Sequence, residues 1–116
     1  MRHLEDNLQI ACVTWFTLQF PKIAQYLHHS PNGGFRNTRE AARSKQMGVR
    51  PGFPDLLLLY PSEKFHYLAI ELKSEKGKQT KSQKKWHEMI QETGNKYVIC
   101  RNIDQFMTAI NDYMNL

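Results

Sequence analysis

Apolar residues in the first part of the chain recur at helical spacing and predict an N-terminal helix that ends before Pro21, since proline supplies no backbone donor. Residues 22–29 read as a short strand, and the run Ser-Pro-Asn-Gly-Gly at 30–34 as a turn. The pattern therefore places one amphipathic helix ahead of any sheet. Its predicted apolar face consists of Leu4, Leu8, Ala11, Trp15 and Leu18.

The central part of the chain predicts a short basic helix and then a hairpin. Asn37 can cap the helix with Glu40 three residues later, and Gly48 suits its end. Residues 49–54 form a stiff loop that contains two prolines. Residues 55–60 and 65–73 read as apolar strands separated by a short turn, which favours antiparallel pairing.

The last third alternates loop, helix, strand and helix. After a charged loop at 74–79, Thr80 and Gln83 form a capping box for a helix that reaches about Thr93. Residues 96–101 read as a buried strand. The order predicts an α/β fold, a mixed sheet flanked by helices, in a single domain over residues 1–116. The final amphipathic helix carries Ile103, Phe106, Met107, Ile110, Tyr113 and Met114.

Composition narrows the class of protein. Of 116 residues, 41% are hydrophobic and 23% are charged, which argues against a disordered or fibrous chain. Two cysteines, Cys12 and Cys100, are too few for a disulfide scaffold or a closed zinc site, so we expect buried reduced thiols. The N-terminus lacks the apolar stretch of a signal peptide, and no apolar run could span a bilayer. The expected location is cytoplasmic.

Positive charge is concentrated in two stretches. The net charge is +5, but residues 36–50 carry +4 and residues 73–85 carry +5, which leaves −4 for the rest. This distribution fits a surface for a phosphate backbone, although two solvated faces would give the same pattern. Arg36, Arg39 and Arg43 share one helical face because they are three and four residues apart. The DNA-binding residues predicted from these stretches are Arg36, Arg39, Arg43, Lys76, Lys78 and Lys81.

The candidate chemistry lies at the ends of the predicted hairpin. Asp55 opens the first strand, and Glu71 and Lys73 close the second on a shared face. An acid-x-Lys triplet occurs about once by chance in an average chain. The signal is therefore the combination, which places two carboxylates and a lysine at one end of a sheet. Such a set suits Mg²⁺, which prefers oxygen ligands and keeps several waters.

At these residues the chain resembles the PD-(D/E)XK nucleases, and specifically their virus-type replication–repair nuclease (VRR-NUC) domains. The resemblance covers nearly the whole chain, as in stand-alone phage and bacterial members. It implies a restriction-endonuclease-like fold. The motifs that carry it are the leading Glu5-Asp6-Asn7-Leu8-Gln9 helix, Pro31-Asn32-Gly33-Gly34, Gly48-x-x-Pro51-Gly52-Phe53-Pro54-Asp55, Glu71-Leu72-Lys73 and Thr80-x-x-Gln83-x-x-Trp86.

The resemblance also implies roles for individual residues. Asp55, Glu71 and the carbonyl of Leu72 would bind Mg²⁺ or Mn²⁺, and Lys73 would orient water. Gln83 would support the site, although its position also fits a purely structural capping box. The family places an acidic residue of the first helix near the metal, and Glu5 fits that pattern best, with Asp6 beside it.

Other candidate residues have simpler interpretations. His28 and His29 are adjacent, so a strand would turn them to opposite faces, and we expect both to be structural. Trp15 and Trp86 lie on apolar faces and are expected in the core. The sequence contains no glycine-rich phosphate loop, no Ser/His/Asp set and no reactive-cysteine context.

The function expected from these features is metal-dependent DNA cleavage by an endonuclease. The resemblance favours a homodimer that resolves four-way (Holliday) junctions, since two symmetric cuts need two identical sites. Large apolar residues on the last helix hint at a spare face for pairing, unless all of them belong to the core. The alternatives are a monomeric flap nuclease and a non-catalytic DNA-binding module that retains the fold.

Overall fold

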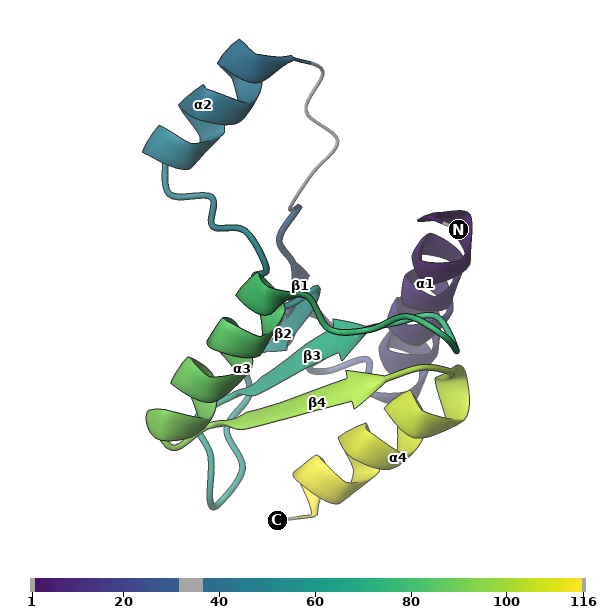
Figure 1. Ribbon diagram of the computed structural model, residues 1–116. Helices are drawn as coiled ribbons and strands as arrows, with labels where there is room; N and C mark the ends of the chain where they lie inside the picture. Colours follow the sequence, from purple (N-terminus) through teal and green to yellow (C-terminus); the bar gives the residue numbers. More distant parts are fainter. Residues whose placement is uncertain (1, 32–36, 116) are drawn as a thin grey trace.

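The computed structural model describes residues 2–31 and 37–115 (Figure 1). The predicted turn at 30–34 therefore lies partly, and Arg36 wholly, outside the described residues. In chain order the elements are α1 (Arg2–Gln19), the 3₁₀ helix η1 (Ala24–Tyr26), β1 (Leu27–His29), α2 (Thr38–Gln46), β2 (Leu56–Leu58), β3 (Leu68–Leu72), α3 (Lys81–Glu92), β4 (Lys96–Cys100) and α4 (Ile103–Met114).

The four strands form one mixed sheet in the order β1-β2-β3-β4. β2 pairs antiparallel with both β1 and β3, so the predicted hairpin is confirmed. β3 pairs in parallel with β4, and α3 forms the crossover between them. The mixed α/β fold class is confirmed, with each strand shorter than the sequence predicts. β1 is shortest relative to its predicted range, because a 3₁₀ turn takes up residues 24–26.

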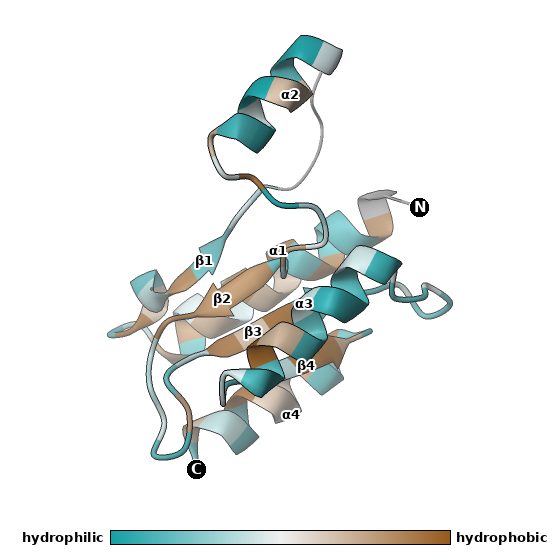
Figure 2. Cartoon of the chain, turned by 60° about the vertical axis from the view of Figure 1, so that its left-hand side comes forward, coloured by the Kyte–Doolittle hydropathy of each residue, from teal (hydrophilic) through white to brown (hydrophobic). Residues whose placement is uncertain are grey.

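Alternate residues of each strand face two different helix layers. Leu68, Ile70 and Leu72 of β3 enter the larger core, which α1 and α4 cover with Cys12, Phe16, Phe106 and Ile110. Ala69 points to the opposite face, where it packs with Ile90 of α3 and Tyr97 of β4. Figures 1 and 2 show α3 on one side of the sheet and α1 with α4 on the other. Glu71 is two residues after Ala69, so strand alternation places it on the same face of the sheet, the one that α3 covers.

The predicted apolar face of α1 is partly wrong. Leu4 and Leu18 are 60% and 77% exposed, whereas Cys12 and Phe16 are fully buried. The helix is apolar on more than one side, so two stripes satisfy helical spacing, and the contacts with the sheet select the stripe through Phe16. Leu8 and Trp15 pack against this core as predicted.

Most apolar residues of the last helix belong to the core. Phe106, Ile110 and Tyr113 are buried, and Met114 packs against the same core. The core alternative therefore accounts for these residues, whereas Met107 is half-buried and lies outside the core clusters. Cys12 and Cys100 are free and buried, as predicted, and burial raises the pKa of the Cys100 thiol to about 11.

Helix α2 stands apart from the sheet. The side chain of Asn37 caps it by accepting a hydrogen bond from the backbone N–H of Glu40, as predicted, at 2.8 Å. None of its residues is buried. Figure 1 shows the helix projecting beyond the layers, and Figure 2 shows it largely hydrophilic where the strands are hydrophobic. No helix among the described residues is long and apolar enough to cross a membrane.

Candidate active site

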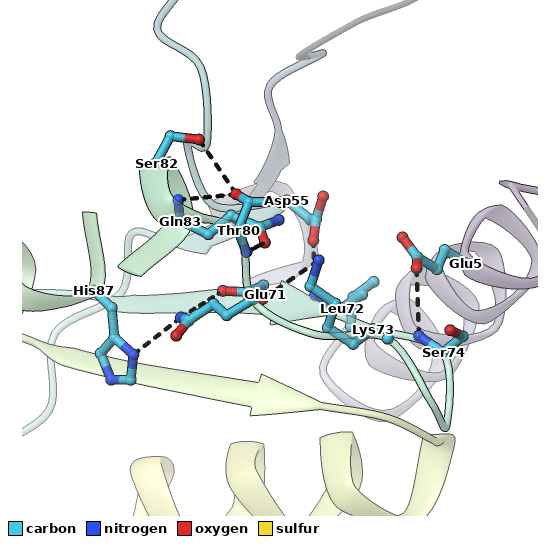
Figure 3. A network of polar contacts seen from close by, with 12 residues as sticks. Glu5, Asp55, Glu71, Leu72, Lys73, Ser74, Thr80, Ser82, Gln83 and His87 are labelled. Atoms are coloured by element: carbon cyan, nitrogen blue, oxygen red, sulfur yellow. Dashed lines mark hydrogen bonds and ion pairs between the residues drawn. The ribbon is translucent and has the colours of Figure 1, made fainter. Parts of the chain in front are cut away.

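The predicted acidic residues meet where β2 begins and β3 ends. Asp55 directly precedes β2, and the antiparallel register pairs Leu56 with Ile70, so Asp55 lies beside the last residues of β3. One carboxylate oxygen of Asp55, Oδ2, accepts a hydrogen bond from the backbone N–H of Leu72 at 2.7 Å. Figure 3 shows Asp55, Glu71 and Lys73 gathered at this end of the sheet. The structure thus brings together residues that are 16 positions apart.

Glu71 is a buried carboxylate whose two oxygens have different surroundings. Its side chain is 1% exposed. Oε1 accepts hydrogen bonds from the hydroxyl of Tyr97 at 2.5 Å and from the side-chain amide of Gln79 at 2.9 Å. Oε2 is buried without a hydrogen-bond partner among the described residues. A buried carboxylate oxygen without a partner is unfavourable, so this atom suits a bound cation.

Lys73 supplies the positive charge at the site. Its Nζ lies 3.9 Å from Oε2 of Glu71, which is an ion-pair contact rather than a hydrogen bond. The residue is 8% exposed, and its backbone N–H extends the sheet by donating to the carbonyl of Cys100 at 3.0 Å. A Cβ built on Gly77 would lie 3.3 Å from Cδ of Lys73, so the loop after β3 packs closely over the lysine. The backbone hydrogen bond to Cys100 and the packing of the loop along the aliphatic part of the side chain therefore hold Lys73 beside Glu71.

Glu5, rather than Asp6, reaches the site from α1. Its Oε2 accepts a hydrogen bond from the backbone N–H of Ser74 at 3.4 Å, and Figure 3 shows it beside the end of β3. Burial raises the pKa of Asp55 above its usual value, the hydrogen bond from Leu72 lowers it, and the charges of Glu71 and Glu5 raise it further. Asp6 is exposed. The helix thus contributes a third carboxylate to the negative potential around Asp55.

The side chain of Gln83 is used for capping. Its carbonyl oxygen accepts a hydrogen bond from the backbone N–H of Thr80 at 2.8 Å, while the Thr80 hydroxyl accepts from the Gln83 N–H. The capping box is therefore confirmed. Of the two interpretations of Gln83, its hydrogen bonds support the structural one, and Gln79 rather than Gln83 contacts Glu71.

The loop before Asp55 packs tightly on the start of α3. Gly52 has φ of +77°, and a Cβ placed there would lie 2.5 Å from the backbone carbon of Ser82. Only glycine fits this approach without strain. Trp86 ties the same loop down by donating from Nε1 to the carbonyl of Pro51 at 3.1 Å, and its ring meets Phe53 edge-on. The position of Asp55 is thus coupled to α3.

The predicted DNA-binding residues occupy two separate places. Arg39 and Arg43 lie exposed on α2, four residues apart. Lys76 and Lys78 are exposed on the loop that follows β3, and Lys81 is exposed at the start of α3. The loop is held by Arg101, whose guanidinium donates to the carbonyls of Ser74 at 2.9 Å and Gly77 at 2.6 Å. The lysines therefore flank the carboxylates, and the arginines project from the body.

The remaining candidates have structural contacts. The Nδ1 atom of His29 lies 2.8 Å from the backbone carbonyl oxygen of Asp55, so this exposed histidine steadies the loop at the site. His28 is also exposed. Trp15 and Trp86 pack against the two core clusters, as predicted.

Sequence reasoning missed two side chains that hold Glu71. Tyr97 was part of a predicted buried strand, and its hydroxyl gave no separate signal. Gln79 was part of a charged loop. Tyr97 becomes visible only once β4 is known to lie in parallel beside β3, with Tyr97 opposite Ala69, and Gln79 only once the path of the loop after β3 is known. The period of two then puts Tyr97 on the same face as Glu71.

The residues present fit a divalent cation that keeps part of its water shell. No group of three or more His, Cys, Asp or Glu side chains in the described part of the chain is placed to hold a metal ion alone. Mg²⁺ needs fewer protein ligands, because it is commonly held by one or two carboxylates together with water and substrate phosphate. Asp55, Glu71 and the Leu72 carbonyl could form such a set of oxygen donors, and the supporting observation is that the buried Oε2 of Glu71 accepts no hydrogen bond among the described residues.

Comparison with known proteins identifies the family. The model of the VRR-NUC domain matches residues 2–103. A solved structure described as a VRR_NUC domain protein is 34% identical and superposes with a TM-score of 0.84, covering 97% of this chain and 88% of its own. No curated protein sequence matches the chain. Together with the mixed sheet and its acidic end described above, these matches show that the chain belongs to the VRR-NUC family.

Proposed function

We propose that this protein is an endonuclease that uses Mg²⁺ or Mn²⁺ to hydrolyse DNA phosphodiester bonds. The observation that carries the proposal is the pair of carboxylates, Asp55 and Glu71, at one end of the sheet with Lys73 beside them. Oε2 of Glu71 is buried and accepts no hydrogen bond among the described residues, which leaves it available to a cation beside the Lys73 ammonium. The non-catalytic alternative gives no reason to bury these charges together.

The residues have distinct tasks in this reaction. A divalent cation at the site supplies polarisation of a phosphate oxygen and a more acidic bound water. Asp55, Glu71 and the Leu72 carbonyl would hold it. The Lys73 ammonium, which cannot bind a cation, orients the attacking water or stabilises negative charge that develops on the phosphate. Glu5 would support the cation from α1 through its negative charge, held beside the end of β3 by the Ser74 N–H.

The test is cleavage by the Asp55→Asn and Glu71→Gln variants with Mg²⁺ and Mn²⁺ on linear duplex, flap and four-way-junction DNA. Both variants are expected to lose cleavage and to keep DNA binding, because the basic surface is unchanged. Full activity of Asp55→Asn would overturn the assignment. If the wild-type protein binds DNA but cuts none of these substrates with either ion, the non-catalytic binding module is correct.

A matched pair of variants separates Glu5 from its neighbour. Glu5→Gln removes a carboxylate that contacts Ser74 at the site, whereas Asp6→Asn removes an exposed one. Glu5→Gln is expected to lower the cleavage rate, and Asp6→Asn is expected to leave it unchanged. The reverse result would assign the helix carboxylate to Asp6.

The finer proposal is a homodimer that acts on branched DNA. A junction needs two symmetric cuts, and a two-fold dimer provides two identical sites. Ile10 and Leu18 of α1 support pairing, because they are 64% and 77% exposed and their spacing of eight residues places them on one side of the helix. Two large exposed apolar side chains on one side of a helix give the proposed dimer a surface to bury. The pairing surface is thus expected on α1 rather than on α4.

Sedimentation tests the dimer directly. Ile10→Glu with Leu18→Glu should convert a dimer into monomers and abolish paired cuts at a four-way junction. Leu59→Glu is the control, since Leu59 is 55% exposed and follows β2 rather than belonging to α1. A wild-type monomer that cuts flaps and leaves junctions whole would establish the flap-nuclease alternative.

A further inference from the structure

Glu71 is held by a linked set of polar side chains to which the proposed reaction assigns no catalytic role. Its Oε1 accepts both the Tyr97 hydroxyl and the Gln79 amide, at 2.5 and 2.9 Å. Tyr97 is 4% exposed, and burial together with the negative charge of Glu71 raises the pKa of its phenol, so the hydroxyl remains a donor. One carboxylate oxygen is therefore fully engaged by the protein.

The second link fixes the orientation of Gln79. The Nε2 atom of Gln79 also lies 3.1 Å from Nδ1 of His87. An amide nitrogen only donates, so Nδ1 must be the acceptor and the proton of the neutral imidazole must be on Nε2. A flipped amide would place its oxygen against the Glu71 carboxylate, which has no hydrogen to donate. Both N–H groups of the amide are thus committed, one to Glu71 and one to His87.

Ring stacking completes the chain. The His87 ring lies parallel to the Tyr97 ring, with centroids 4.2 Å apart and an angle of 13° between the planes. His87 therefore supports both donors, one by stacking and one by hydrogen bonding. The three residues come from β4, from the loop after β3 and from α3, so the packing of three elements determines how Glu71 is oriented.

We infer that Tyr97 and Gln79, supported by His87, are positioning residues that fix Glu71 so that Oε2 alone remains available to a divalent cation. The inference rests on the proposed function. A carboxylate held on one oxygen cannot rotate to satisfy its other oxygen within the protein, so the cation meets a preorganised ligand. Removing a residue that hydrogen-bonds to a metal ligand commonly weakens metal affinity by about 10- to 100-fold.

The experiment measures Mn²⁺ affinity of the DNA-free protein by calorimetry and the Mn²⁺ concentration that gives half-maximal cleavage. Tyr97→Phe keeps the ring and removes the hydroxyl, and is expected to weaken both values by about tenfold or more. Saturating Mn²⁺ should restore most of the cleavage rate, because Asp55, Glu71 and Lys73 are unchanged. Gln79→Ala, on a loop, tests the second donor without altering the core.

Tyr113→Phe is the matched control. Its hydroxyl is also buried and donates to the carbonyl of Tyr60 at 2.7 Å, on the α4 side of the sheet. The Tyr113→Phe variant should be less stable than the wild-type protein but should bind Mn²⁺ with unchanged affinity. His87→Phe retains a stacking ring, loses the Nδ1 acceptor and should have a smaller effect than Gln79→Ala.

Two negative results have different meanings. If the wild-type protein binds Mn²⁺ and cleaves DNA, while Tyr97→Phe and Gln79→Ala match it in both metal measurements, the positioning role is wrong and the nuclease stands. If Tyr97→Phe does not fold, Gln79→Ala alone decides. A wild-type protein that neither binds Mn²⁺ nor cleaves DNA overturns the proposed function and, with it, this inference.

Discussion

The end of β3 and helix α2 both carry charged side chains, but the protein holds them in opposite ways. At the end of β3, Glu71 and Lys73 are 1% and 8% exposed and are fixed by contacts from β4 and from the loop after β3. On α2 no residue is buried, and Arg39 and Arg43 are exposed to solvent. Figure 1 shows this helix away from the sheet that carries the carboxylates.

The difference between the buried charges of β3 and the exposed charges of α2 suits two different tasks, catalysis and DNA binding. A reacting group must be placed within a fraction of an ångström, which requires packing and hydrogen bonds around it. Phosphate contacts tolerate variation, because charge attraction is weakly directional and carries no sequence information. Substitutions at the end of β3 should therefore act on the rate, and substitutions on α2 should act on affinity. The predictions below test that division.

The largest effect is expected for Lys73→Ala. The ammonium stabilises charge at the reacting phosphate or orients water, so its loss should lower the cleavage rate constant by a factor of about 100 or more. Mn²⁺ affinity should change little, since an ammonium does not bind a cation. Single-turnover cleavage with calorimetric metal binding measures both. An unchanged rate, or a lost metal site, contradicts this assignment.

The next effect is expected for the double variant Arg39→Gln with Arg43→Gln. It should bind every DNA sequence more weakly, and the slope of log affinity against log salt should become shallower by about 1.8, for two lost phosphate contacts. The cleavage rate at saturating DNA should be unchanged. Titrations at several salt concentrations provide the slope.

The control for this prediction removes two lysines at the other end of the sheet. Lys96 begins β4 opposite the first residue of β3, and Lys64 lies in the turn before β3, so both are far from the carboxylates along the strands. Lys64→Gln with Lys96→Gln makes the same change in net charge. An equal loss of affinity in the control would show that only overall charge matters.

The third effect concerns the loop that carries Lys76 and Lys78 beside the site. Arg101→Met keeps the apolar stem and removes the donors to Ser74 and Gly77, so we expect a loss of about 1–2 kcal/mol in the free energy of unfolding. Cleavage should fall a few-fold, because Lys73 packs against this loop. Thermal unfolding and steady-state kinetics measure the two. Arg50→Met, at an exposed position with one long contact of 3.5 Å, should change neither quantity.

The sequence predicts the local parts of this site well. Strand parity places Glu71 and Lys73 on one face, and the caps at Asn37 and Thr80 depend only on residues three apart, so neighbouring positions decide them. The antiparallel register of the hairpin, with Leu56 opposite Ile70, brings Asp55 to Glu71, although the connection over residues 59–67 is longer than the predicted turn. These features need no knowledge of distant contacts.

The parts that sequence reasoning missed depend on packing between distant elements. The buried face of α1 is chosen by the sheet, since Leu18 and Phe16 satisfy the helical pattern equally well and only Phe16 is buried. Tyr97 reaches Glu71 only through the parallel register across the α3 crossover. Arg101 contacts a loop 24–27 residues earlier in the chain. No local pattern encodes such pairings.

The smallest effect tests whether the site at the end of β3 is held at a cost in stability. Burial raises the pKa of Asp55 above its unfolded value, so the unfolded carboxyl ionises at lower pH than the folded one. Between the unfolded pKa and the folded pKa of Asp55, the folded state therefore binds more protons than the unfolded state. Stability therefore falls as pH rises through the folded pKa, and the ionised carboxylate destabilises the metal-free protein at neutral pH.

Asp55→Asn removes that charge and keeps an oxygen that can accept the Leu72 N–H. With EDTA at pH 7 the inactive variant should melt roughly a few °C above the wild-type protein, and the difference should shrink toward pH 4. Asp104→Asn is the opposite control, because Asp104 lies exposed in the first turn of α4, where a negative charge stabilises the helix. It should melt slightly lower. A melting temperature of Asp55→Asn at or below the wild-type value would mean that the Leu72 hydrogen bond to an ionised carboxylate outweighs its burial, and that the site is no less stable than the rest of the fold.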